Sequence, residues 1–244
     1  MSASHPLPVS VIVPVRNGAA QLRRALASVH VAAPAEVIVI DGGSSDGSAQ
    51  VAQAFAAELG HRSAAGPPAI RVITQRSSGL AAARNEALAV ACQPFVAFCD
   101  SDDRWHPEGL AALYAALTAD PDANAKAHVA IGQVLPEVLD GTDPAQLRDA
   151  QRDRIGTALP GFTPGAMLAR RAVFDRLGGF DETLSIGADS DWFVRLVQSE
   201  FGLVRLDKVT LYKGMRAHSL SADVARYRKE LLVIAARFIA RRRR

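Results

Sequence analysis

The feature that most constrains the fold of this chain is a repeated alternation of short β-branched segments with longer alanine-rich segments in its first half. Four apolar runs in this half are predicted as core strands: residues 9–15, 37–40, 70–73 and 95–99. The segments between them favour helices: residues 21–29, 50–59 and 80–91. Because parallel strands joined by helical crossovers produce this pattern, we predict an α/β fold with a mainly parallel central sheet.

The second half of the chain alternates less regularly. Pro107 stands at a predicted helix start, and the leucines that follow it have helical spacing. Beyond this helix we predict a strand, two helices and two edge strands, in this order: residues 129–135, 170–177, 190–199, 204–206 and 209–212. Residues 140–153 are polar and charged, which favours a solvated connection that contains at most a short helix.

The end of the chain combines an amphipathic pattern with a basic tail. Val224, Tyr227, Leu231, Ile234 and Phe238 recur at three- and four-residue steps, which predicts a helix with one apolar face. The last four residues are all arginines. This segment could dock on an acidic membrane surface or on nucleic acid, and a solvated tail is the alternative interpretation.

Composition places the chain among globular proteins. Its 244 residues are 49% apolar, which is enough for a substantial core. The formal net charge is only +3, so we expect no nucleic-acid partner. Cys92 and Cys99 do not suggest a disulfide framework, and neither a signal peptide nor a membrane-spanning run is recognised. We therefore expect a cytoplasmic protein, with a peripheral position at the inner face of the membrane as the alternative.

Polar loops follow all four predicted strands, and the loop after the fourth strand is the most acidic. Ligands of open parallel sheets bind beyond the carboxyl ends of the strands, so these loops are expected to form one crevice. Asp100, Asp102 and Asp103 lie within four residues and repel one another unless a cation compensates them. Mg²⁺ prefers one or two carboxylates with phosphate oxygens and water, which predicts a metal-bound phosphate here. A solvated acidic turn before the helix at Pro107 is the alternative.

The loop after the second predicted strand begins with Asp41, Gly42 and Gly43. Glycines allow a ligand to approach the backbone closely, and Asp41 could accept hydrogen bonds from a nucleobase or ribose. The alternative is an ordinary turn, in which Asp46 only caps a helix. The chain has neither a dinucleotide-binding fingerprint nor a P-loop, so both of those classes lose their main support.

Taken together, these segments resemble the family 2 glycosyltransferases of the GT-A fold. The similarity runs from Val9 to about Ser221 and is carried by four segments in order: Val9-Ser-Val-Ile-Val-Pro-Val-Arg-Asn17, Val39-Ile-Asp-Gly-Gly-Ser-Ser-Asp-Gly47, Gly79-Leu-Ala-Ala-Ala-Arg-Asn85 and Phe98-Cys-Asp-Ser-Asp-Asp103. The last of them is similar to the Asp-x-Asp motif of the family. The resemblance implies a Rossmann-like, mainly parallel sheet flanked by helices, with a smaller acceptor-side half.

The resemblance also implies a division of the chain and a set of roles. We expect one domain over residues 1–244, in three parts: a nucleotide-sugar-binding half at 1–105, an acceptor-side half at 106–221, and a C-terminal helix with its tail at 222–244. By the match, the residues that line the nucleotide pocket are Pro14, Arg16, Asp41 and Arg84. Asp100 would face the ribose or the metal, and Asp102 would ligate a Mn²⁺ or Mg²⁺ ion.

Two later segments match the acceptor side and the diphosphate side of the family. Gly187-Ala-Asp-Ser-Asp-Trp192 followed by Arg195 resembles the Glu-Asp motif, which makes Asp189 the expected general base and Asp191 the second choice. A helix cap at Asp189 or Ser190 is the alternative. The segment from Arg216 to Ser221 resembles the part that closes over the diphosphate, so Arg216 is expected to bind phosphate and His218 the metal.

Two departures from the family pattern bear on selectivity. Gly42 stands where a second carboxylate is common, and Ala188 replaces the usual Glu before the base. The implied activity is an inverting transfer of a sugar from a nucleotide-sugar donor, most simply a UDP-sugar, by direct displacement with an Asp base and a metal. The acceptor stays open between a glycan, a lipid-linked molecule, a peptide and a small molecule. A nucleotidyltransferase and a catalytically idle nucleotide-sugar-binding protein are the alternatives.

Overall fold

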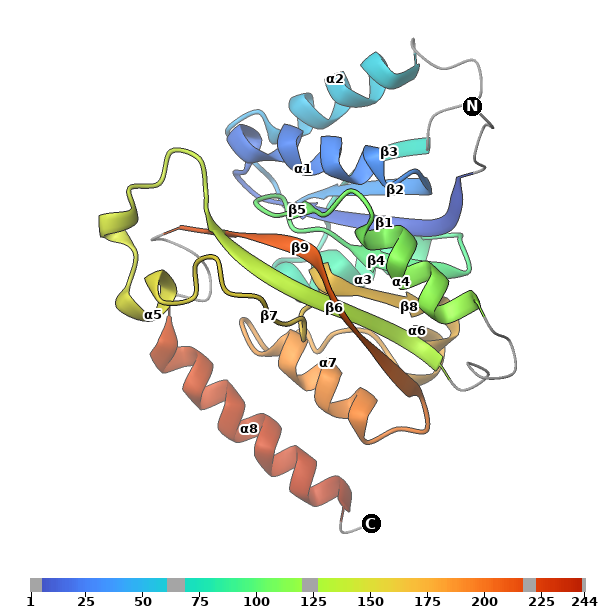
Figure 1. Ribbon diagram of the computed structural model, residues 1–244, viewed down its shortest axis with the longest axis vertical. Coiled ribbons are helices and arrows are strands. Elements are labelled where there is room, and N and C mark those ends of the chain that lie inside the picture. Colours follow the sequence, from blue (N-terminus) through green and yellow to red (C-terminus); the bar gives the residue numbers. More distant parts are fainter. Residues whose placement is uncertain (1–5, 61–68, 120–126, 217–222, 243–244) are drawn as a thin grey trace.

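A mixed β-sheet runs through the molecule, and helices cover both of its faces (Figure 1). The computed structural model describes residues 6–60, 69–119, 127–216 and 223–242. Within these residues the strand order is β3-β2-β1-β4-β8-β6-β9-β5, and β7 pairs with β6 beside this path. The predicted α/β class is therefore confirmed.

The first half of the sheet consists of four parallel strands, as predicted. These strands are β1 (Leu7–Val15), β2 (Pro34–Asp41), β3 (Ala69–Thr74) and β4 (Phe95–Phe98). The connecting helices are α1 (Ala19–Val31), α2 (Ser48–Gly60) and α3 (Leu80–Val90). Every predicted strand and helix of this half is present, with ends that shift by at most a few residues.

Burial on both faces explains why these strands are so rich in Val and Ile. Alternate residues of β1 point to opposite sides, so Val11 and Val13 pack beneath α1 and α2, whereas Ile12 packs with α3. All three side chains are fully buried. Helices thus cover both faces, and the loops at the strand ends are left as the accessible edge of the sheet.

The second half of the sheet is mixed. Its strands are β5 (Arg104–Trp105), β6 (Ala127–Val138), β7 (Leu159–Pro160), β8 (Met167–Arg170) and β9 (Gly202–Met215). Strand β8 runs antiparallel to both β4 and β6, whereas β6 and β9 are parallel. The helices of this half are α4 (Gly109–Thr118), α5 (Asp149–Arg152), α6 (Arg171–Leu177), α7 (Ala188–Val197) and α8 (Val224–Arg242), with 3-10 turns η1 (Pro144–Gln146) and η2 (Pro164–Ala166).

Two predictions for this half were wrong. Residues 204–206 and 209–212 belong to the single strand β9, which lies inside the sheet between β6 and β5. A register shift between Arg205 and Val209 accommodates the charged residues that looked like a break. Strand β8 was not foreseen, and Arg170, predicted to start a helix, is its last residue. The short helices η1 and α5 agree with the predicted solvated connection at 140–153.

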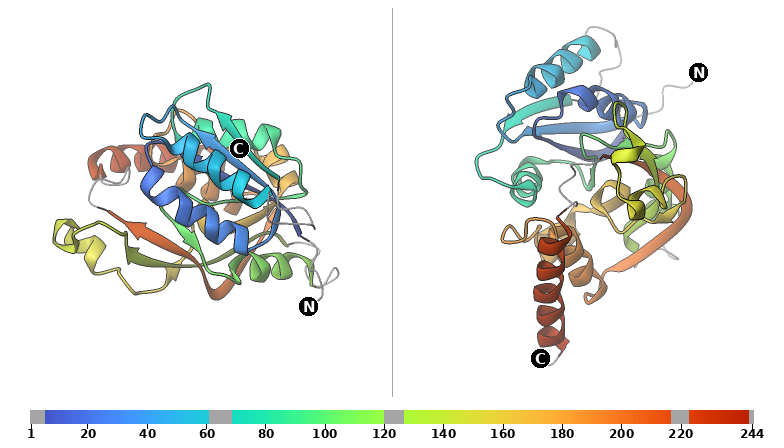
Figure 2. Two further views of the ribbon diagram at one scale, coloured as in Figure 1. Left: turned by 90° about the horizontal axis from the view of Figure 1, so that it is seen from above. Right: turned by 90° about the vertical axis from the view of Figure 1, so that its left-hand side faces the viewer.

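Helix α8 packs along α7 and extends beyond the rest of the molecule (Figure 2). One stripe of α8 faces the body, and Ile234 on this stripe is 4% exposed. The outward face carries Leu232 at 72% and Ile239 at 51% exposure. Among the described residues, no helix has both the length and the apolar character needed to cross a membrane.

Candidate active site

The four loops at the strand ends meet in one place, as predicted from the sequence. Backbone bonds join them in pairs: Gly42 N donates to Val15 O at 2.8 Å, and Gln75 N donates to Asp41 O at 2.8 Å. The first loop also packs against the acidic loop, because a Cβ atom on Gly18 would lie 2.9 Å from Ser101 Oγ. Segments from four parts of the first 103 residues therefore meet at the edge of the sheet where the sequence predicts the crevice.

Side chains tie the first two loops together. Asn17, with a φ of 51°, donates from its backbone to Ser44 Oγ at 2.9 Å and accepts from the backbone N–H of Ser45 at 2.9 Å. Asp46 accepts from the backbone N–H of Ala19 at 2.9 Å and from Ser48 Oγ at 2.6 Å. Asp46 thus stabilises the starts of α1 and α2, which extends its expected capping role.

The predicted nucleotide residues of these loops differ in accessibility. Asp41 is 7% exposed, and both of its oxygens accept from Ser44, by the backbone N–H at 3.1 Å and the hydroxyl at 2.5 Å. Pro14 is buried and Arg16 is exposed at the edge of the crevice. A Cβ atom on Gly42 would lie 2.9 Å from Gln75 Oε1, which is the end of a flexible side chain and can move aside.

Basic side chains of the chain itself compensate the acidic loop. Asp100 accepts from Arg84 Nη2 at 2.8 Å, and Asp102 lies 3.1 Å from Arg216 Nη2. Asp103 lies 3.5 Å from Lys213 Nζ and accepts from the backbone N–H of the following glycine, Gly214, at 2.9 Å. The alternative of a solvated acidic turn is not supported, because Asp103 is 1% exposed and α4 begins only at residue 109.

Sequence reasoning missed Lys213 and the pairing of the cluster by cations of the chain. Cations of the chain already compensate part of the charge of these carboxylates, so their crowding does not by itself require a metal. The inward position of Lys213 could have been predicted from the sequence, because Lys213 lies two positions after the buried Leu211 and so shares its face of a strand. Gly214 is equally constrained, since a Cβ atom there would lie 2.2 Å from the carbonyl oxygen of Asp102.

The pKa values of Asp100 and Asp103 are shifted in opposite directions. Burial favours the neutral form of Asp100, but Arg84, Lys213 and Arg216 outweigh it and lower the pKa of this carboxyl. For Asp103, burial dominates and raises the pKa to about 7, although Lys213 opposes the shift. The nearby Asp103 carboxylate, with the other acids, raises the pKa of Lys213 and keeps this ammonium charged.

Arg84 connects the acidic loop to the predicted base. Its Nη2 donates to Asp100 and its Nη1 donates to Asp189 Oδ1 at 2.5 Å, across 105 positions of sequence. The guanidinium is 1% exposed and lies 5.4 Å from the ring centre of Phe180. Arg84 therefore lies beneath the surface of the crevice, and its contact with a nucleotide stays a prediction.

The structure distinguishes the two candidate bases on α7. Asp191 is 2% exposed and accepts from Arg195 Nε at 2.8 Å, one helical turn later. The side chain of Asp189 is 28% exposed and faces Arg84. Burial raises the pKa of Asp189, and the neighbouring Asp100 adds to this effect against the opposing charge of Arg84. Of the pair, Asp189 has the accessibility that proton removal requires.

A divalent ion can be fitted to this loop through Asp102. The side chain of Asp102 is 21% exposed, and its partner Arg216 is 43% exposed, so this ion pair can rearrange. One carboxylate with diphosphate oxygens and water suits Mg²⁺ or Mn²⁺. Within the described residues, no group of three or more His, Cys, Asp or Glu side chains is arranged as a cage, and His218 lies outside those residues.

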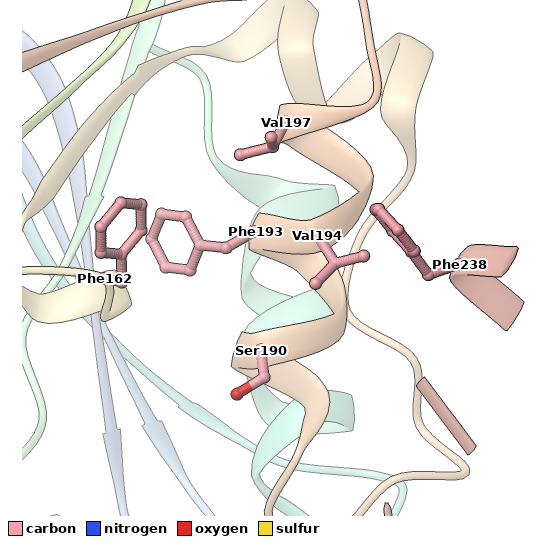
Figure 3. Close-up of a pocket in the computed structure, with 6 residues that line it drawn as sticks. All are labelled: Phe162, Ser190, Phe193, Val194, Val197 and Phe238. Carbon is pink, nitrogen blue, oxygen red and sulfur yellow. The ribbon is translucent and has the colours of Figure 1, made fainter. Parts of the chain in front are cut away.

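A separate apolar pocket lies on another face of α7. Figure 3 shows Ser190, Phe193, Val194 and Val197 projecting from α7 between Phe162 and Phe238. The pocket has a volume of about 310 Å³. Its residues recur at helical spacing on the side of α7 next to α8, whereas Asp189 faces Arg84. The pocket is therefore not part of the crevice at the strand ends.

Known proteins resemble this chain in sequence and in fold. The model of the family described as Glycosyl transferase family 2 matches residues 10–178. The succinoglycan biosynthesis protein ExoU of Rhizobium meliloti is 33% identical over 214 residues, which are 80% of this chain and 58% of that protein. The chain thus spans little more than half the length of this curated relative.

Two solved structures share the fold over most of this chain. The mannosyltransferase PcManGT of Pyrobaculum calidifontis, in complex with GDP-Man and Mn²⁺, superposes with a TM-score of 0.67 at 19% identity, covering 97% of this chain and 65% of that one. TarS 1-349 of S. aureus, in complex with UDP-GlcNAc, gives a TM-score of 0.65 at 22% identity, with coverages of 88% and 60%. At these identities the likeness establishes the fold.

Proposed function

Because the chain belongs to glycosyl transferase family 2 and has the GT-A fold, we propose that it transfers a sugar from a UDP-sugar to an acceptor with inversion at the anomeric carbon. The observation that carries this proposal is the buried Arg84, which joins Asp100 at the end of β4 to Asp189 at the start of α7. Arg84 thereby holds Asp100, the acid on the donor side, close to Asp189, the candidate base.

In the proposed reaction, Asp189 accepts the proton of the acceptor hydroxyl as this oxygen attacks the anomeric carbon. The nucleoside diphosphate leaves from the opposite face, so one carboxylate base is sufficient. Arg84 holds Asp189 by one Nη and Asp100 by the other, and its planar fork restricts the orientation of both. Proton transfer by a positioned carboxylate typically contributes about 10²- to 10⁴-fold to a rate.

Asp102 would hold the divalent ion, with Asp100 beside it, while His218 remains a predicted further ligand. A Mn²⁺ or Mg²⁺ ion in this position would act as a Lewis acid that neutralises charge on the departing diphosphate. Arg216 lies next to Asp102 and can exchange its ion pair for a bond to a phosphate oxygen. Lys213 adds positive charge to the same side of the crevice.

We also propose the division of roles expected from the sequence. Strands β1 to β4 and their loops, in residues 1–105, would bind the nucleotide sugar through Pro14, Arg16 and Asp41. Residues 106–221 would bind the acceptor. Support comes from the position of the acidic loop, which lies between the parallel strands and the end of β9.

A product assay tests this function. Purified protein is incubated with UDP- and GDP-sugars, Mn²⁺ and a panel of acceptors, and released nucleoside diphosphate is measured with the anomeric configuration of the product. We expect UDP release that requires the metal, and about a 10²-fold or larger loss of kcat in Asp189→Asn. Asp102→Ala should remove the metal dependence of UDP binding, which calorimetry measures without turnover.

The outcomes separate the alternatives. Pyrophosphate release from a nucleoside triphosphate would establish the nucleotidyltransferase instead, although the comparisons offer it no support. Donor binding without transfer to any acceptor would favour the nucleotide-sugar-binding protein. Full activity of Asp189→Asn would refute the assignment of the base.

Helix α8 supports peripheral attachment to an anionic membrane as a second part of the proposal. Between Val224 and Arg242 this helix has six basic residues and one acidic residue, and Leu232 and Ile239 are exposed outward. Apolar insertion combined with basic residues favours anionic interfaces. Co-sedimentation with vesicles of phosphatidylglycerol and phosphatidylcholine should decrease in Leu232→Asp. Equal sedimentation of this variant and the wild type would contradict the attachment.

A further inference from the structure

The helix that carries Asp189 is capped from outside by Glu230 of α8. Helix α7 begins with Gly187 at its N-cap, and the structure shows no side-chain capping bond from this residue. The carboxylate of Glu230 accepts the backbone N–H groups of Ser185, Ile186 and Gly187, at 3.0, 2.9 and 2.7 Å. The side chain of Glu230 is 12% exposed. An acid 43 residues away thus occupies the anion position at the start of α7.

Close packing leaves this arrangement little freedom. A Cβ atom on Gly187 would lie 3.0 Å from Ile234 and 3.2 Å from the carboxylate of Glu230. One turn before Glu230, Tyr227 Oη lies 2.9 Å from Ser190 Oγ, which joins α8 to the first turn of α7 a second time. The position of the first turn of α7 therefore depends directly on α8.

The bonds of Glu230 also hold the segment from which Asp189 projects. They bind the N–H of Gly187, the N-cap of α7, and the two N–H groups before it. Two residues later, Asp189 faces Arg84 across the crevice. The alternative of a helix cap at Asp189 or Ser190 does not hold in the structure, because these side chains bond Arg84 and Tyr227.

We propose that Glu230 is a positioning residue for the transfer reaction, which acts by capping α7 so that Asp189 points into the crevice. This inference rests on the proposed role of Asp189 as the base. The bonds of Glu230 go to the backbone at 185–187 and to Arg226, so its role needs no contact with either substrate. Its loss should therefore affect the chemical step more than the binding of the donor.

The experiment compares Glu230→Ala and Glu230→Gln with Arg237→Gln. Arg237 belongs to the same helix, but it pairs with Asp181 at 2.6 Å, away from the first turn of α7, so it controls for weaker docking of α8. We expect kcat of Glu230→Ala to fall between about tenfold and 100-fold, by analogy with small misplacements of catalytic groups, while KM for the donor stays within about twofold. Glu230→Gln keeps an acceptor oxygen, so its kcat should decrease less. The kcat of Arg237→Gln should stay near that of the wild type.

The pH profile of kcat provides a readout that a purely structural role would not move. Asp189 faces Arg84, with Asp100 and Lys213 nearby, and these groups are unchanged in the variants. Without Glu230, the N–H of Gly187 at the start of α7 is freed and a negative charge is lost, and both changes favour the ionised form of Asp189. The acid limb of kcat should therefore move to lower pH in Glu230→Ala, and less in Glu230→Gln.

The possible results separate the two levels of the proposal. If both Glu230 variants melt at lower temperature while kcat and its acid limb match the wild type, Glu230 is only a structural cap and this inference is overturned. The same holds if Arg237→Gln loses as much kcat as Glu230→Ala. If instead Asp189→Asn retains activity, the proposed function fails at its base. Titration with UDP confirms in each case that the donor half remains folded.

Discussion

Replacing Arg84 with methionine should cost about 3 kcal/mol of folding free energy, because breaking a buried ion pair typically costs about 3–5 kcal/mol. The guanidinium is 1% exposed, but its partners Asp100 and Asp189 are 21% and 28% exposed, so water screens part of the loss and the lower end of the range applies. Methionine retains apolar contact with the rings of Phe98 and Phe180 that flank the side chain. The main change is therefore the loss of charge.

The cost should depend on pH in a defined direction. In the wild type, the pKa of Asp100 is lowered, so its ionised form stabilises the fold above the unfolded value of about 4 and loses this contribution as pH falls. Without Arg84, burial would raise the pKa of both Asp100 and Asp189 above their unfolded values. Both acids would then destabilise the fold increasingly as pH rises. The difference between variant and wild type should be largest near pH 8 and small near pH 4.

Urea unfolding followed by circular dichroism at several pH values measures this difference. The double variant with Asp189→Asn should recover more than about 1 kcal/mol at pH 8, because only one unpaired carboxylate remains. A matched control is Arg23→Met, since Arg23 pairs with Glu58 at the surface, where water and salt screen the two charges. A loss at Arg84 no larger than at Arg23, or a loss independent of pH, would refute the reasoning.

Three further predictions concern the crevice. Gly214→Ala should destabilise the protein by about 1–3 kcal/mol and weaken UDP binding, because the new methyl group would meet the backbone of Asp102. A melting temperature and a UDP affinity equal to those of the wild type would contradict this prediction. The raised pKa of Asp189 predicts that kcat decreases on acidification at a pH above the ordinary aspartate range, and a profile flat down to pH 4 would be inconsistent with it. Asp191→Asn should lower the melting temperature, since the variant loses the ion pair with Arg195. In a rate assay of both variants, it should reduce kcat much less than Asp189→Asn does.

The first half of the fold could be predicted because its signals are local. Strands such as β1 and β2 are buried on both faces, so they must be continuous runs of apolar residues, and their crossovers must be helical. Loops at the carboxyl ends of such strands necessarily meet, which predicted the crevice around Asp41 and Asp100. The strand β9 was harder to predict as one element, because its bulge at the charged residues Asp207 and Lys208 interrupts the alternation of apolar and polar residues that identifies a strand.

What the sequence determined by itself was the class of fold, the family and the set of acids from which the site is made. Only the tertiary structure decided which charges meet: Lys213 with Asp103, Arg84 with both Asp100 and Asp189, and Glu230 with the start of α7. It also gives Asp189 and Asp191 different exposure and different partners, although the sequence surroundings of the two are nearly the same. The physical reason is that burial and pairing depend on contacts between residues distant in the chain, which local pattern does not encode.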